Sequence, residues 1–146
     1  MNALEVQDVS IRFGGLRALS QVSFRVPKGQ IVGLIGPNGA GKTTMFNIIA
    51  GSLRPDAGSV HILGAETTGE PPFRIARRGV GRTFQLMRPF GQLSVLENLT
   101  AAALSATPHT GEAIRAARAI AERTGLDRYA GHRASDLPTA AKKRLE

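Results

Sequence analysis

One eight-residue stretch, residues 36–43, constrains the fold of this chain more than any other. It reads GPNGAGKT and fits the pattern G-x-x-x-x-G-K-[ST]. Its glycines let the backbone curl until several N–H groups point into one concavity, which suits phosphate oxygens. Lys42 adds a positive charge for the β- and γ-phosphates, and the Thr43 hydroxyl can bind Mg²⁺. The stretch therefore predicts a binding site for a nucleoside triphosphate.

The flanking residues have the structure that such a loop requires. Residues 30–35 form a short and almost wholly apolar run, so we expect a buried parallel strand there. Residues 42–50 are typical of a helix that ends at Gly51. The N-terminus of that helix adds partial positive charge to the loop. The alternative is a glycine-rich turn that binds nothing, but such a turn has no use for Lys and Thr at these offsets.

Composition limits the other classes of function. A chain of 146 residues with 42% hydrophobic content suits one folded domain. The absence of Cys excludes disulfides and thiolate metal sites and fits a reducing compartment. No secretory signal is visible, and no apolar run approaches the ~20 residues of a membrane span, so we expect any membrane work to need a partner.

Charge and histidine spacing argue against two further kinds of site. The net charge is +8, but the basic residues are spread out and not interleaved with aromatics, which favours a solvated surface over nucleic-acid binding. The histidines His61, His109 and His132 lie far apart without a nearby carboxylate cluster. Their spacing predicts neither a zinc site nor a histidine-based catalytic set.

The first half of the chain otherwise reads as strands. Residues 9–13 and 22–26 alternate apolar and polar side chains, which predicts two half-exposed strands in an antiparallel pair, and residues 59–63 predict a third. Phe13 lies where the first of these strands becomes a loop. It could stack on an adenine ring or be an ordinary core or edge aromatic, and the residues alone favour the second reading.

Later segments are mostly helical. A short helix is expected from the prolines at 71 and 72 to Arg78, followed by a strand over residues 80–85. That strand ends at Gln85, which could reach Mg²⁺ or its water. A capping box at Ser94 and Glu97 predicts a helix to Leu104. A second helix over about 111–124 is expected to bury Ile114, Ala117, Ile120 and Ala121, and a last helix to begin near Thr139.

Laid end to end, residues 4–146 resemble the nucleotide-binding subunit of ATP-binding cassette (ABC) transporters. Within that family the likeness is to the ATP-binding proteins of branched-chain amino-acid importers. The residues that carry it lie at 13–19, 35–44, 82–85, 94–98 and 143–146. The resemblance implies an α/β fold, a P-loop NTPase (ABC ATPase) core that is incomplete at the C-terminus. Its expected parts are a mainly β subdomain with antiparallel strands (1–35 and 52–70), the P-loop and its helix (36–51), and a helical subdomain after the Q-loop (86–146).

The resemblance assigns ATP and Mg²⁺ as ligands. Phe13 matches the aromatic that stacks on adenine, which reverses the reading from residues alone. Gln85 matches the Q-loop residue that helps to hold Mg²⁺ and to orient the attacking water, and Thr43 matches the other Mg²⁺ ligand. No catalytic residue is expected within these 146 residues. The expected phosphate-binding residues are Gly36, Asn38, Gly39, Ala40, Gly41, Lys42, Thr43 and Thr44.

The resemblance also implies partners and a location. Two such subunits, identical or different, sandwich ATP between them and dock on permease subunits at the cytoplasmic face of the cell membrane. A solute-binding protein takes part indirectly, branched-chain or similar amino acids are imported, and no nucleic acid is expected to bind. Residues 86–104 are the expected coupling surface, with the basic residues Arg82 and Arg88 beside it.

Two departures from the family pattern affect the mechanism. Where the family has L-S-G-G-Q or L-P-Y-G-Q, this chain has Ala140 in place of a glycine and Ala141 in place of the glutamine. The added Cβ of Ala140 is expected to weaken contact with the partner's nucleotide. The family's Walker B strand, catalytic Glu, D-loop and His switch have no match up to residue 146, and Glu146 is not that Glu because no apolar strand ending in Asp precedes it. We therefore expect nucleotide binding with negligible turnover by these 146 residues.

Two other functions remain open at this point. One is a short, non-hydrolysing nucleotide-binding or regulatory module, which the altered signature favours. The other is an ABC protein associated with nucleic acid, for which the charge of +8 is the only support.

Overall fold

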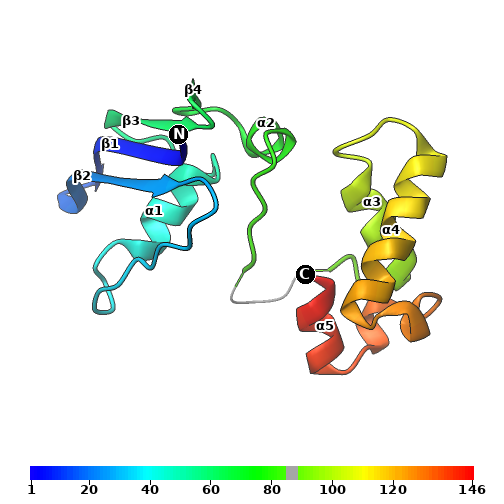
Figure 1. The fold of residues 1–146 in the computed structure, drawn as a ribbon. Helices are drawn as coiled ribbons and strands as arrows, with labels where there is room; N and C mark the ends of the chain where they lie inside the picture. Colours follow the sequence, from blue (N-terminus) through cyan, green and yellow to red (C-terminus); the bar gives the residue numbers. More distant parts are fainter. Residues whose placement is uncertain (85–88) are drawn as a thin grey trace. The chain divides into compact units, whose positions relative to one another are not determined.

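The computed structural model describes residues 1–84 and 89–146. These residues form two compact units, 1–80 and 81–146. All the strands belong to the first unit, together with two helices, and the second unit is helical (Figure 1). Among the described residues, no helix is both long enough and apolar enough to cross a membrane.

The first unit is built on a four-stranded antiparallel sheet with the order β2-β1-β3-β4. The predicted antiparallel pair is confirmed, and both of its strands are longer than expected. The predicted strand over 59–63 is also present, shifted by a residue or two. The strands are β1 (Asn2–Phe13), β2 (Leu16–Pro27), β3 (Ala57–Ile62) and β4 (Ala65–Glu66).

A bulge in β1 explains how two residues three apart both reach the core. Val6 and Val9 are both buried, although strict alternation would place them on opposite faces of the sheet. The register shifts between them, and Asp8 has a φ of +48°. Its N–H donates to the Ser23 hydroxyl at 2.8 Å instead of to the ladder. The extra residue restores the inward direction of Val9.

Helix α1 (Lys42–Ile49) covers one face of this sheet (Figure 1). Its buried residues Met45 and Ile48 are three apart and pack against Val9, Ile11 and Leu19 of the sheet. The predicted helix over 42–50 is confirmed to within one residue, and Gly51 follows it with a φ of +74°. Helix α2 (Pro72–Arg77) confirms the short helix expected after the two prolines.

Two predicted strands are wrong. Residues 30–35 and 80–84 have no regular structure, and the side chains of Ile31 and Ile35 are almost fully exposed. A parallel strand exists only through hydrogen bonds to a neighbour. Within the described residues, no strand of the sheet pairs with either segment, so the apolar run cannot become a buried strand.

The second unit packs its helices around one small apolar core. Its α-helices are α3 (Val95–Ala103), α4 (Thr110–Thr124) and α5 (Thr139–Leu145), joined by the 3-10 helices η1 (Asp127–Tyr129) and η2 (Ala134–Asp136). The three helices predicted in this half are all present. The core consists of Val95, Ala121, Leu126, Ala134, Leu137, Ala141 and Leu145.

Helix α4 buries Ala117 and Ala121 as expected, and Ile114 is half-buried, but Ile120 is not buried. Ala113, Ala117 and Ala121 are buried at intervals of four residues, whereas Ile120 is 40% exposed. The prediction that Ile120 would be buried is therefore wrong. Small side chains on the inner face let α4 lie close to its neighbours, and the isoleucine is left outside.

Specific residues fix the N-terminus of α3 and the C-terminus of α4. The predicted capping box is confirmed, since the Glu97 N–H donates to Ser94 Oγ at 3.2 Å and the Ser94 N–H donates to Glu97 Oε2 at 2.7 Å. Gly125 ends α4 with a φ of +64°. Arg144 Nη1 donates to the Thr124 carbonyl at 2.9 Å, which places a positive charge at the C-terminus of α4.

Candidate nucleotide-binding site

The loop over residues 36–43 curls tightly before α1. Gly39 and Gly41 have φ values of +83° and +84°, and the Ala40 N–H donates to the Pro37 carbonyl at 3.2 Å. Helix α1 begins at Lys42, and no side-chain hydrogen bond caps its N-terminus. Its first N–H groups therefore face outward without a side-chain acceptor, as an anion-binding helix end requires.

Gly41 is the point where this loop touches the sheet. A Cβ added there would lie 2.6 Å from Leu19 Cδ2 and 2.7 Å from the Ala18 carbonyl oxygen. Both contacts are shorter than packed atoms allow, and the carbonyl cannot move without distorting β2. Only glycine fits, so the glycine of the motif holds the loop against β2 as well as giving it a left-handed turn.

Lys42 already points into the loop. Its Nζ donates to the Gly36 carbonyl at 2.5 Å and to the Pro37 carbonyl at 2.6 Å. The ammonium group thus lies among the backbone atoms that the motif predicts around a phosphate. Thr43 and Thr44 follow in the first turn of α1, and Thr43 is exposed. A crowded glycine, an uncapped helix end and an inward lysine together fit a bound triphosphate.

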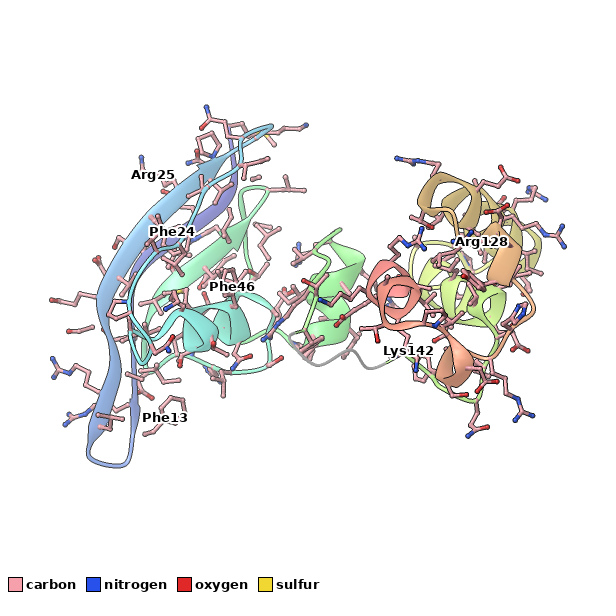
Figure 2. The ribbon with its side chains drawn as sticks, turned by 90° about the horizontal axis from the view of Figure 1, so that it is seen from below. Phe13, Phe24, Arg25, Phe46, Arg128 and Lys142 are labelled. Carbon is pink, nitrogen blue, oxygen red and sulfur yellow. The ribbon has the colours of Figure 1, made fainter. Side chains whose placement is uncertain are left out.

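Phe13 lies at the tip of the hairpin that β1 and β2 form (Figure 2). Its side chain is 47% exposed, which is too much for a core aromatic. Because Phe13 comes two residues after the buried Ile11, it shares the face of β1 that turns toward α1. The loop contacts the same hairpin at Ala18 and Leu19, so Phe13 and the loop belong to one region of the first unit. Its contact with adenine stays a prediction.

Gln85 lies outside the described residues, as do Leu86, Met87 and Arg88. The preceding segment is fixed within the second unit. The Phe84 N–H donates to Glu146 Oε1 at 2.6 Å, and the Arg82 guanidinium lies 4.6 Å from the centre of the Phe84 ring. The role expected for Gln85 therefore stays a prediction.

Residues 137–141, which lie where the family has its signature sequence L-S-G-G-Q, differ in exposure. Pro138 precedes α5, and Thr139 and Ala140 are exposed at its first turn. Ala141 is buried in the core of the helical unit. Of residues 137–141, only Pro138, Thr139 and Ala140 are therefore exposed, because Leu137 is buried as well.

Asn98 organises the segment after the Q-loop, and sequence reasoning gave it no role of its own. The side chain is nearly buried in α3. Its Oδ1 accepts the Phe90 N–H at 2.8 Å, and its Nδ2 donates to the carbonyls of Phe90 and Ser94 at 3.0 and 2.9 Å. The only available signal was an amide side chain within a mostly apolar helix.

The ion pair nearest to α2 has a structural role. The Arg78 guanidinium lies 2.7 Å from the Glu70 carboxylate. Their hydrogen bond lowers the pKa of Glu70 and raises that of Arg78. The pair closes the turn around α2, and neither residue belongs to the loop.

The sequence model of the ABC transporter family matches residues 19–146, and the chain belongs to this family. One similar protein is the high-affinity branched-chain amino acid transport ATP-binding protein BraF of Pseudomonas aeruginosa, at 39% identity. Another is the corresponding protein LivG of Escherichia coli, also at 39% identity. In both cases the match covers 98% of this chain and 62% of the relative, so the chain spans less than two thirds of their length.

Solved structures give the same result for the fold. An ATP-binding cassette of an ABC transporter has a TM-score of 0.86 and 31% identity, and the match covers all of this chain and 63% of that one. The same cassette in its ADP conformation has a TM-score of 0.85 at 29% identity, covering 99% and 62%. A bacterial ABC transporter cassette solved as a dimer has a TM-score of 0.82 at 25% identity, covering 97% and 66%. The expected fold class, that of an ABC ATPase cassette, is confirmed, and the chain spans about two thirds of each of these structures.

Proposed function

We propose that this chain is the nucleotide-binding part of an ABC importer that takes up branched-chain or similar amino acids and uses ATP. The observation that carries the proposal is Lys42, which donates to two carbonyls of a glycine loop at an uncapped helix end. The names of the similar proteins support the transport role, and the ADP conformation of the similar cassette supports the nucleotide.

Each residue of the loop has a separate task in this proposal. Backbone N–H groups of residues 38–44 surround the phosphates, Lys42 neutralises their charge, and Phe13 stacks on the base. Thr43 and Gln85 would hold Mg²⁺, which supplies charge neutralisation on the phosphates when bound. The residues described here bind and orient the nucleotide. A general base for the attacking water would lie outside them.

The partners in this proposal are permease subunits and a second ATP-binding subunit, with the solute-binding protein acting indirectly. The coupling surface follows Gln85, over residues 86–104. Its described part exposes Phe90 and Leu93, and Asn98 fixes the backbone between them. Exposed apolar side chains on an ordered loop are suited to docking. The chain would then be peripheral, at the cytoplasmic face of the membrane.

A non-hydrolysing regulatory module is the second candidate. Ala140 favours it, because this exposed residue puts a Cβ where the family pattern has glycine. A weakened contact there would let nucleotide bind without closing a productive dimer. Under either candidate, we expect negligible turnover from these 146 residues.

The test is MgATP binding to the wild-type chain and to Lys42→Ala, measured by calorimetry. We expect Lys42→Ala to weaken binding at least roughly tenfold, because a charge-assisted contact to phosphate is lost. Lys28→Ala is the matched control, since Lys28 is exposed in the same unit and lies outside the loop. Equal affinity of wild type and Lys42→Ala would refute the proposed site.

Turnover is measured in the same samples as phosphate release. We expect no release above the level of Lys42→Ala. Release that Lys42→Ala abolishes would show that these residues hydrolyse ATP, and would contradict the expectation of negligible turnover.

A further inference from the structure

Two exposed apolar side chains face each other at the tip of the β1–β2 hairpin. Gly14 and Gly15 form the whole connection, and Phe13 pairs directly with Leu16 across the strands. Directly opposed residues of an antiparallel pair share one face, with their Cβ atoms about 5 Å apart. Phe13 is 47% exposed and Leu16 is 70% exposed, so the pair forms a small apolar surface open to solvent.

This surface continues the face that carries the core. Ile11, two residues before Phe13, is buried, and Ala18, two residues after Leu16, packs against the same core. Phe13 points to the side of the sheet that α1 covers (Figure 2), and Leu16 shares its face because the two residues pair directly across the hairpin. Arg12 and Arg17 also pair across the hairpin, and alternation places them on the other face. The tip is thus apolar on one face and basic on the other.

The phosphate-binding loop lies beside the same strand. Gly41 contacts β2 at Ala18 and Leu19, and Leu16 is only two residues, or about 7 Å, further along that strand. A nucleotide that holds its phosphates in the loop would therefore lay its base along β2 toward the tip. Leu16 is then as well placed as Phe13 to meet that base.

We propose that Leu16 is a second base-contacting residue, which forms with Phe13 a two-residue apolar platform under the nucleobase. The inference rests on the proposed function, because the loop must first hold the phosphates. Phe13 offers a ring for stacking, and Leu16 extends the buried area beyond the ring. Neither side chain has a hydrogen-bonding group. The platform therefore gains affinity from any purine without distinguishing adenine from guanine.

A calorimetric test with three ligands distinguishes the contribution of the base to affinity from that of the phosphates. The ligands are MgATP, MgGTP and magnesium tripolyphosphate. We expect Leu16→Ala to weaken MgATP and MgGTP binding by the same factor, roughly three- to tenfold, because apolar contact area is lost. Tripolyphosphate has no base, so its affinity is expected to stay at the wild-type value. Leu16→Met keeps the apolar area and is expected to bind all three ligands as wild type does.

Leu63→Ala is the matched control. Leu63 is 49% exposed at the turn between β3 and β4 of the same unit, so its removal deletes a similar side chain away from the loop. We expect no change with any ligand. Far-UV circular dichroism of each variant monitors folding, and the high exposure of Leu16 predicts an unchanged spectrum.

The outcomes separate this inference from the proposed function. Wild-type affinity of Leu16→Ala for MgATP would overturn the platform, as would an equal loss for tripolyphosphate, which would indicate damage to the loop. If Lys42→Ala bound MgATP as tightly as wild type, the proposed function itself would fail. If Lys42→Ala lost MgATP binding and Leu16→Ala bound MgATP as wild type does, the proposed nucleotide site would stand and only the platform would be rejected.

Discussion

At the scale of single residues, Gly41 has two structural roles that substitutions can distinguish. It adopts a left-handed backbone, and it brings the loop into contact with β2 at Ala18 and Leu19. Gly64 has nearly the same φ, +83°, but an added Cβ there meets no atom within 4 Å. The two glycines therefore share the backbone strain of a substitution and differ only in crowding.

We predict that Gly64→Ala lowers the free energy of unfolding by about 1–2 kcal/mol, from backbone strain alone. Gly41→Ala is expected to lower it further and to abolish MgATP binding, because the Cβ pushes the loop away from β2. Urea denaturation and calorimetry measure the two effects. Equal destabilisation by both substitutions would show that the contact with β2 has little importance.

The sequence was sufficient to predict the tight glycine turn before α1, because its residue types are demanded by the local backbone. It was not sufficient for Leu16, whose proposed role depends on its pairing with Phe13 across the hairpin. The role of Asn98 could not be predicted from the sequence either. Its hydrogen-bond partners are backbone groups of the preceding loop, and the sequence does not predict where that loop lies. Residues 30–35 show the opposite failure, a structure predicted from sequence that does not form. Their apolar run predicts a strand, but pairing needs a neighbour that the described residues lack.

At the scale of elements, α3 depends on its capping box. The Ser94 N–H donates to the Glu97 carboxylate, and this hydrogen bond lowers the pKa of Glu97 below its ordinary value. A carboxyl with a lowered folded-state pKa stabilises the fold fully above its unfolded pKa. That contribution is lost as the pH falls through the folded pKa.

We predict that the helical unit loses part of its stability through Glu97 as the pH falls below 4.5, the ordinary pKa of this carboxyl. Glu97→Gln is expected to remove this part of the pH dependence and to be less stable than wild type at neutral pH. Chemical denaturation at several pH values, followed by circular dichroism, measures both. Glu122→Gln, on the exposed face of α4, is the control. Parallel pH profiles of wild type and Glu97→Gln would contradict the assignment.

At the scale of the whole molecule, the apolar segment 30–35 matters most. Ile31 and Ile35 are almost fully exposed in a segment that forms no strand. Exposed, consecutive apolar residues with unpaired backbone groups favour association between copies. We therefore expect this 146-residue chain to be marginally stable and prone to aggregate.

We predict that Ile35→Lys shifts the chain toward the monomer, because a charge is placed within the exposed run. Sedimentation velocity over a range of concentrations measures the shift. Ile120→Lys makes the same change at an isolated exposed isoleucine of α4 and is expected to leave association unchanged. A wild-type chain that stays monomeric and unfolds cooperatively would contradict the prediction.

The lysine of the loop also sets a limit on how nucleotide affinity can vary. Lys42 donates hydrogen bonds to the carbonyls of Gly36 and Pro37, so a phosphate at the proposed site would have to compete with these carbonyls for its ammonium group. Both acceptors are main-chain atoms, and no substitution of a side chain can delete them. The resting state of the loop is therefore fixed by its own backbone. Homologues that need a higher or lower affinity for nucleotide would have to change residues elsewhere. In our proposal the hairpin tip, where Phe13 and Leu16 would contact the base through their side chains, is free to vary.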